Sequence, residues 1–188
     1  MTTATQAKNE DRSAPQEKKV EDFYDLIDGI EIAMLTTRLG DGALVSRPMA
    51  TQKRREGVDL WFVTSTETHK VEEIEREPHI NLGYYKDAEW VSVSGRATLV
   101  RDRALIRQLY QPDWRAWFGD EGGERDGGPD DPRLVLIVVK VESATYFKRT
   151  QSRPVMWLNV MKSVITGDPP DIGEVGHLKG SELHSSKR

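Results

Sequence analysis

The spacing of apolar residues predicts helices at a few places along the chain and short strands elsewhere. From Lys18 to Asp28 apolar residues return every three or four positions, which predicts an amphipathic helix ending near Gly29. Between residues 32 and 100, apolar and β-branched runs alternate with polar turns, a pattern typical of strands. The expected strands are residues 32–37, 43–51, 59–64, 80–85 and 90–100.

The second half of the chain continues this mixture. Hydroxyl-rich residues 65–68 predict the start of a short helix that Pro78 stops, and Asp102 predicts the cap of another, broken near Pro112. Gly95 predicts a bulge or a close approach of two backbones. The glycine-rich, acidic stretch 119–132 predicts a mobile loop. Two last strands are expected at 134–141 and 145–148, followed by a helix from Pro154 to Gly167.

The order of these elements predicts a mainly β, α+β architecture. Strands arrive in neighbouring pairs with few helices between them, which favours an antiparallel sheet of six or seven strands, closed or nearly closed into a barrel, with a few flanking helices. One domain is expected over residues 18–167. Residues 1–17 are interpreted as a flexible leader and residues 168–188 as a polar tail, because both are poor in apolar residues.

Composition excludes several classes of function. The chain has 188 residues, a formal net charge of -4 and no cysteine, which argues against nucleic-acid binding and excludes thiolate chemistry, disulfides and cysteine zinc sites. The four histidines lack metal-ligand spacing, so no metal site is predicted. No dinucleotide or P-loop glycine motif is present. The longest apolar run is too short to cross a membrane, and we predict a cytoplasmic protein with no membrane or nucleic-acid partner.

Two neighbouring segments carry the residues that could bind an anion. Arg47 lies in one expected strand, and Lys70 follows the hydroxyl-rich turn after the next strand. A guanidinium, a second cation and the free N–H groups of a helix start are the groups that a phosphate requires. A lysine in a first helical turn opposes the helix dipole unless an anion is present. Taken alone, Arg47 is better interpreted as a solvated or salt-bridged surface arginine.

The ordered motifs of the chain resemble the general stress protein 26 branch of the pyridoxamine-phosphate-oxidase-like flavoproteins. The resemblance covers about residues 18–167, and it rests on the order and spacing of the motifs together. They are Ser46-Arg47-Pro48-Met49, Leu60-Trp61-Phe62-Val63-Thr64, His69-Lys70-Val71, Pro78-His79-Ile80-Asn81-Leu82, Trp90-Val91-Ser92-Val93-Ser94-Gly95-Arg96-Ala97, Trp117-Phe118 and Asp131-Pro132.

This resemblance implies a split β-barrel homodimer with one FMN in each of two sites at the subunit interface. It implies that Arg47 and Lys70 hold the FMN phosphate, with Thr68 and His69 as further candidates at that end. The residues expected to flank the isoalloxazine ring or the ribityl chain are Pro48, Met49, Phe62, Val63 and Thr64. Trp117 is a candidate for closing the site from the partner subunit, and a packed helix-face aromatic is the alternative for it.

The same resemblance favours an FMN-dependent oxidoreductase in which the flavin carries the hydride chemistry. No side chain is assigned a catalytic role. The alternative is a non-catalytic FMN-binding stress or sensor protein, which the same pocket would serve. Related split barrels also bind deazaflavin or haem. Pyridoxamine-phosphate oxidases proper end in an arginine- and histidine-containing segment that has no counterpart in residues 176–184, so oxidation of vitamin B6 is disfavoured.

Overall fold

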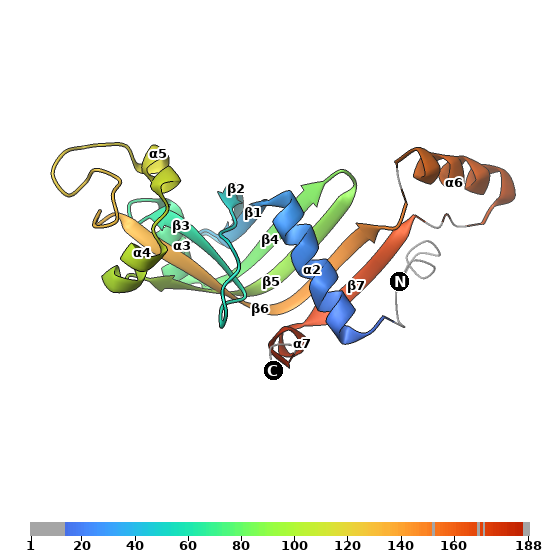
Figure 1. The fold of residues 1–188 in the computed structure, drawn as a ribbon, viewed down its shortest axis with the longest axis horizontal. Coiled ribbons are helices and arrows are strands. Elements are labelled where there is room, and N and C mark those ends of the chain that lie inside the picture. The colour runs from blue at the N-terminus through green and yellow to red at the C-terminus, as the bar shows by residue number, and fades with distance from the viewer. Residues whose placement is uncertain (1–13, 152, 169, 171, 186–188) are drawn as a thin grey trace.

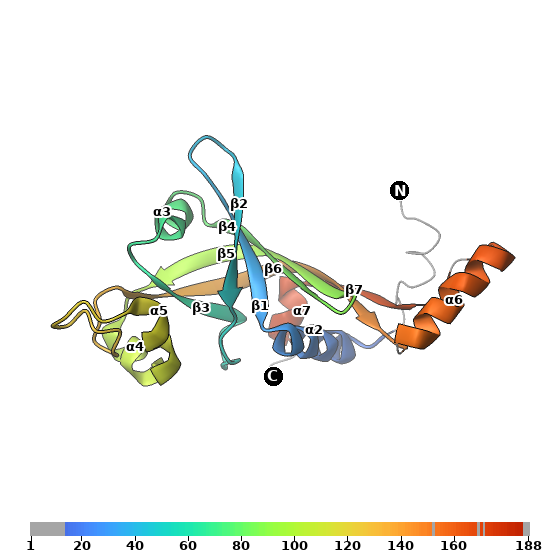
Figure 2. The same ribbon diagram turned by 90° about the horizontal axis from the view of Figure 1, so that it is seen from above.

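The strands form one curled antiparallel sheet. The computed structural model describes residues 14–151, 153–168, 170 and 172–185. The strand order is β2-β1-β4-β5-β6-β3, and β7 pairs with β6, which gives the open, half-rolled shape in Figures 1 and 2. The predicted six- to seven-stranded split barrel is confirmed. The strands are β1 (Ile32–Arg38), β2 (Leu44–Ala50), β3 (Leu60–Ser65), β4 (His79–Lys86), β5 (Glu89–Val100), β6 (Leu134–Arg149) and β7 (Gly173–Lys179).

Helices flank the sheet and lie at its ends. The helix α2 lies along the sheet, α4 and α5 sit at one end, and α6 projects from the other end (Figure 1). The helices are α2 (Gln16–Ile30), α3 (His69–Arg76), α4 (Arg103–Leu109), α5 (Arg115–Phe118), α6 (Arg153–Thr166) and α7 (Gly180–Ser185), with a single 3-10 turn at Pro112–Trp114. Within the described part of the chain, no helix is long and apolar enough to cross a membrane.

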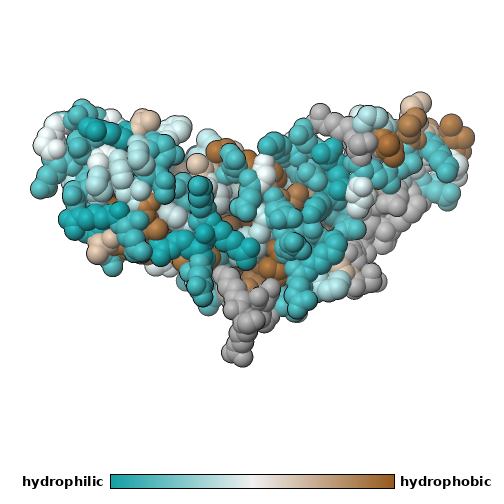
Figure 3. Space-filling view, viewed as in Figure 1, coloured by the Kyte–Doolittle hydropathy of each residue, from teal (hydrophilic) through white to brown (hydrophobic). Residues whose placement is uncertain are grey.

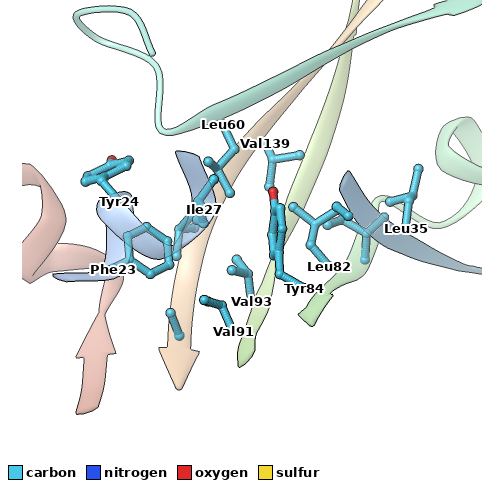
Figure 4. Packing of buried hydrophobic residues seen from close by; sticks show 14 of the residues in the cluster. Phe23, Tyr24, Ile27, Leu35, Leu60, Leu82, Tyr84, Val91, Val93 and Val139 are labelled. Carbon is cyan, nitrogen blue, oxygen red and sulfur yellow. The ribbon is translucent and has the colours of Figure 1, made fainter. Parts of the chain in front are cut away.

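The main core lies between α2 and the inner face of the sheet. Strand β1 alternates buried and exposed positions, as a strand with one covered face must. The buried side of the sheet meets the apolar face of α2, whose Phe23, Tyr24 and Ile27 belong to the same core cluster as the inward residues of the strands. Figure 4 shows Leu82, Tyr84, Val91 and Val93 in this core, with Leu35 farther from α2.

A second core cluster lies under α4 and the 3-10 turn. Trp61, Ile106, Trp114, Leu134 and Leu136 are buried together there. The rings of Trp61 and Trp114 meet edge to face with their centroids 6.2 Å apart, and the indole of Trp61 donates to the carbonyl of Lys53. The two clusters lie on either side of β3 and β6, because residues of these strands alternate between them. Strands β3 and β6 therefore contribute side chains to both clusters.

The C-terminal region differs from the sequence prediction in two ways. Residues 134–149 form the single strand β6 where two strands were expected. Residues 173–179, expected within a polar tail, form β7. Glycines explain why the sequence pattern missed this strand. A Cβ at Gly176 would lie 2.1 Å from the ring of Tyr146, so β7 uses residues with low strand propensity to approach β6 closely.

Several smaller predictions are confirmed. The register between β5 and β6 shifts between Ser94 and Gly95, and a Cβ at Gly95 would lie 2.4 Å from the carbonyl oxygen of Lys140. Asp102 caps α4 by accepting from the backbone N–H groups of Ala104 and Leu105.

Two other predictions stay open. Residues 119–132 contain no helix or strand, and the mobility of that loop stays a prediction. Residues 1–13 of the expected leader lie outside the described residues, and α2 begins at Gln16.

Candidate functional site

Arg47 lies in a closed ring of hydrogen bonds that joins β1, β2 and α3. Its Nη2 atom is 2.7 Å from Oε2 of Glu73, and its Nη1 donates to the hydroxyl of Thr37. That hydroxyl in turn donates to Glu73. Thr37 and Glu73 are buried, while the Arg47 side chain remains 20% exposed. The ring fixes the guanidinium and leaves part of it accessible to a ligand.

Lys70 lies beside this ring, on the first turn of α3. Its Nζ donates to the hydroxyl of Thr64 at 2.9 Å, and the Thr64 hydroxyl lies 3.5 Å from that of Thr68. Thr64 is at the end of β3, and Thr68 is the residue before α3. The sharp connection between β3 and α3 therefore brings a lysine and two hydroxyls together. We call Arg47, Thr64, Thr68 and Lys70 the cationic cluster.

Two pKa shifts describe the electrostatics of the cationic cluster. Burial, and next the charge of Arg47, lower the pKa of Lys70, while Glu73 acts in the opposite direction. Burial raises the pKa of Glu73, but the hydrogen bonds from Thr37 and Arg47 outweigh burial and hold that pKa below its ordinary value. Glu73 is therefore an anion at neutral pH. Two cations lie close enough to repel each other, and one carboxylate compensates them in part.

The other predicted pocket residues of β2 and β3 divide between two faces. Met49 and Phe62 are buried in the main core, so their side chains pack against protein. Pro48 is exposed on the opposite face of β2, where it pairs with Met34. Val63 is half-buried and packs against the second core cluster. Thr64 accepts a hydrogen bond from Lys70, one of the two predicted phosphate ligands, and the flavin-flanking roles of all five residues stay predictions.

His69 and Trp117 are the most exposed of the predicted site residues. The His69 side chain is 93% exposed, and its Nδ1 lies 3.9 Å from Oε2 of Glu72. Trp117 is on α5 and is 85% exposed. Its indole is outside both core clusters, so the alternative of a packed core aromatic does not hold within this chain. Its predicted contact with a partner subunit stays a prediction.

Two residues of the site were missed by sequence reasoning. Thr37 and Glu73 complete the ring around Arg47, yet a threonine in a strand and a glutamate in a short helix are ordinary residues in those places. One signal was available for Glu73. It follows Lys70 by three positions and therefore lies on the same face of α3, beside the buried Ile74. A carboxylate on that face requires a cationic partner.

The donor set of the cationic cluster fits a phosphate ester. Arginine carries five N–H groups and lysine three. Within the described residues, Arg47 uses two of its groups on Thr37 and Glu73, and Lys70 uses one on Thr64. The remaining donors suit the oxygens of one phosphate. The described residues contain no group of three or more His, Asp or Glu side chains placed to hold a metal ion.

A cavity of about 360 Å³ lies elsewhere, between α2 and the turn that joins β4 to β5. Charged side chains line it, but its two lysines are engaged. Lys86 donates to the carbonyl of Gly29, and Lys148 pairs with Asp22. We therefore place the candidate site at the cationic cluster, where cations retain donors for a ligand.

A curled antiparallel sheet of this order places the chain in the class of split-barrel proteins. Comparison with known families makes this specific. The family described as pyridoxamine 5'-phosphate oxidase like matches residues 18–171, and the chain belongs to this family. The resemblance inferred from the motifs is thereby confirmed.

Individual relatives agree with this assignment. The chain is 37% identical to protein bli-3 of Neurospora crassa over 182 residues, which cover 94% of this chain and 87% of the relative. It is 33% identical to general stress protein 26 of Bacillus subtilis over 106 residues, or 53% of this chain and 69% of the relative. A solved structure described as the general stress FMN/FAD binding protein of Xanthomonas citri superposes with a TM-score of 0.59 at 23% identity, covering 72% of this chain and 92% of that chain.

Proposed function

We propose that the protein binds FMN, with the flavin's phosphate held by the cationic cluster. The observation that carries the proposal is the convergence of Arg47 and Lys70, each with donors to spare, beside the hydroxyls of Thr64 and Thr68. The family supports the same ligand, since a structural relative is described as binding FMN or FAD. The flavin, when bound, supplies hydride or electron transfer. The chain binds and orients it, and the proposed activity is that of an oxidoreductase.

The second candidate function is non-catalytic FMN binding, and one observation favours it. Glu73 is the carboxylate of the site, and it is occupied by Arg47 and Thr37 with a lowered pKa. It is therefore poorly suited to take up a proton during a reaction. Reduction of bound FMN by NADH or NADPH, followed by reoxidation by oxygen or a quinone, favours the enzyme. A flavoprotein that is inert to all donors favours the binding role.

The decisive experiment is identification of the ligand. The purified protein is expected to be yellow, to release FMN on denaturation, and to bind FMN more tightly than riboflavin, which lacks the phosphate. Titration calorimetry of the flavin-free protein with both compounds measures this difference. A colourless protein that takes up no FMN, or one that binds both compounds equally, contradicts the assignment of the phosphate to the cationic cluster.

The affinity for FMN is expected to fall as the pH rises from about 7 to about 10, over which range the phosphate stays a dianion. The protonated form of Lys70 binds the phosphate, and its pKa is below the ordinary lysine value, so the loss begins at a lower pH than for an exposed lysine. The Lys70→Arg variant keeps its charge over this range and provides the control. An identical pH profile for both proteins, measured by FMN fluorescence quenching, contradicts this role of Lys70.

The face of the sheet opposite α2, called the outer face below, supports the proposed homodimer. Register pairs align its residues across five strands. No charged side chain stands in the central stretch named below, although 31% of the whole chain is charged, and depletion of charge is characteristic of interface cores. The residues of this stretch are Ser46, Pro48 and Ala50 on β2, Ile32, Met34 and Thr36 on β1, Asn81, Gly83 and Tyr85 on β4, Trp90, Ser92 and Ser94 on β5, and Ser143, Thr145 and Phe147 on β6. Arg38, Arg96 and Lys179 continue the same face at its edges.

The helix α6 extends this uncharged surface. It begins four residues after β6 and projects from the body of the molecule (Figure 2). Its exposed apolar side chains gather at the upper right of Figure 3, and they are Val155, Trp157, Leu158, Met161, Val164 and Ile165. An isolated helix of this length is marginal in water. A second copy of the chain that covers the outer face and α6 would remove both exposed apolar surfaces from water.

The Met34→Asp variant is expected to be a monomer, because it places a charge in the centre of the proposed interface. Met34 is 43% exposed in the single chain, so the fold itself should tolerate the change. Ala104→Asp, on the exposed surface of α4, is the control and should leave the assembly unchanged. Light scattering coupled to gel filtration measures both. A Met34→Asp protein that remains a dimer contradicts an interface on the outer face.

A further inference from the structure

Glu73 is a negative charge in the middle of the proposed phosphate site. Its carboxylate is 2.7 Å from Nη2 of Arg47, and its side chain is only 6% exposed. It also accepts a hydrogen bond from the buried Thr37. A surface carboxylate in this position would be screened by water, but a buried one is screened less and acts more strongly on its neighbours.

The carboxylate has two opposite effects on the cationic cluster. In the absence of a ligand it offsets the repulsion between Arg47 and Lys70 and favours the charged form of Lys70. Two cations held together in a partly buried site without any anion would be unfavourable. When a phosphate binds, the same carboxylate repels it, because both anions face the guanidinium of Arg47. In the ligand-free site, the charges of Arg47, Lys70 and Glu73 sum to one positive unit. Without the charge of Glu73 the sum is two positive units.

We propose that Glu73 is the internal counter-ion of the anion site, stabilising the cationic cluster when it is empty and lowering its affinity for the phosphate. Glu73 is thus an affinity-setting residue that touches Arg47 and not the flavin. The arrangement weakens binding enough for the flavin to exchange, while Arg47 stays in its binding conformation between one ligand and the next. This inference rests on the proposed binding of FMN.

The Glu73→Gln variant tests the inference, because the amide keeps the shape and one acceptor oxygen for Arg47 and Thr37 but loses the charge. Its affinity for FMN is expected to rise about tenfold at low salt, since one repulsive charge at close range is removed. Its affinity for riboflavin should stay within about twofold of the wild type. The melting temperature of the flavin-free variant should fall. A residue with a purely structural role would change the affinities for both compounds together.

One control variant and one further measurement accompany Glu73→Gln. Glu72→Gln removes a charge from the same helix at a side chain that is 71% exposed, and it should leave both affinities unchanged. Thermal unfolding with inorganic phosphate is the second measurement. Phosphate should raise the melting temperature of Glu73→Gln more than that of the wild type, and it should rescue the variant if the variant unfolds without an anion.

The outcomes separate the inference from the function on which it rests. If the wild type prefers FMN to riboflavin but Glu73→Gln binds FMN no more tightly, the counter-ion role is wrong and the phosphate site stands. If the variant binds FMN more weakly and riboflavin normally, Glu73 only positions Arg47. If the wild type does not discriminate between FMN and riboflavin, both proposals are wrong.

Discussion

Replacing Arg133 with methionine is expected to lower the free energy of unfolding by about 3–5 kcal/mol, because it leaves a buried carboxylate without its cation. Asp131 is fully buried and Arg133 is 4% exposed, with 2.6 Å between Nη2 of the arginine and Oδ2 of the aspartate. Methionine fills a similar volume and keeps the packing. The loss therefore reports the unpaired charge together with the lost hydrogen bonds from the guanidinium to Glu121 and to three backbone carbonyls, and not a cavity. Chemical denaturation monitored by tryptophan fluorescence measures it.

The same arginine ties the acidic loop to the barrel. Its guanidinium donates to the backbone carbonyls of Phe118, Gly119 and Arg125, and Asp131 accepts from the backbone N–H of Gly127. The loop has no helix or strand of its own, so these bonds hold it to the barrel, together with the contacts of Tyr110 with Gly127 and of Arg107 with Asp130. Arg133→Met is therefore also expected to accelerate proteolytic cleavage between residues 119 and 130 relative to the wild type.

The pair makes stability depend on pH in a defined direction. The hydrogen bond from Arg133 is the largest influence on Asp131 and lowers its pKa from 3.8 to about 2. A carboxylate whose pKa is lowered in the folded state stabilises the fold at pH values above its pKa in the unfolded chain. This contribution is lost as the pH falls from about 4 towards about 2. Arg133→Met should show a smaller loss of stability over that range. Equal pH dependence in both proteins contradicts the assignment.

Arg107→Ala is the matched control. Its partner Asp130 is next to Asp131 in the chain, but both side chains of the Arg107 pair are more than half exposed. Exposed pairs contribute less than about 1 kcal/mol, and the control should stay within that limit. If Arg133→Met also stays within it, the buried pair contributes little and the loop is held by other contacts.

The fold could be predicted because apolar and β-branched runs are separated by polar turns. Strand β4 buries every second residue, and most of its apolar and polar residues alternate, so this pattern is visible without any knowledge of the partner strand. Strand β1 also buries every second residue, but its exposed Ile32 and Met34 are apolar. Strand β7 could not be predicted, since its buried positions include Gly173 and Gly176, which lie on opposite faces of the strand. Glycine is required at both positions because a side chain there would collide with β6. This requirement comes from a strand some thirty residues earlier in the chain and is not visible in the local sequence.

The sequence predicted only part of the candidate site. Lys70 could be found because a lysine in a first helical turn opposes the helix dipole, and Arg47 could be found because it lies in one of the motifs that resemble the family. The partners of Arg47 satisfy local rules, and only the three-dimensional arrangement brings Thr37 and Glu73 to its guanidinium. The two strands that carry the site, β2 and β3, are not neighbours in the sheet. Strand β3 pairs with β6, so β2 and β3 approach the site from separate places in the sheet.

Replacing Arg47 with alanine is expected to weaken FMN binding by about 1.5–3 kcal/mol, the contribution of a hydrogen bond to a charged group. The affinity for riboflavin should not change, because riboflavin has no phosphate. Arg47→Lys keeps the charge but loses the planar pair of donors, and an intermediate loss is expected. Arg38→Ala, at the exposed end of β1, is the control for removing a cation from this region, and it should bind FMN normally.

One further variant is needed to interpret the loss of FMN affinity in Arg47→Ala. Removing the guanidinium leaves Glu73 buried, ionised and close to the incoming phosphate, so part of the measured loss is repulsion by that carboxylate. The double variant Arg47→Ala/Glu73→Gln removes this part, and it should recover some of the lost affinity without reaching the wild type. Full recovery would mean that Arg47 serves only to neutralise Glu73. Unchanged FMN affinity in Arg47→Ala itself would show that the phosphate binds elsewhere.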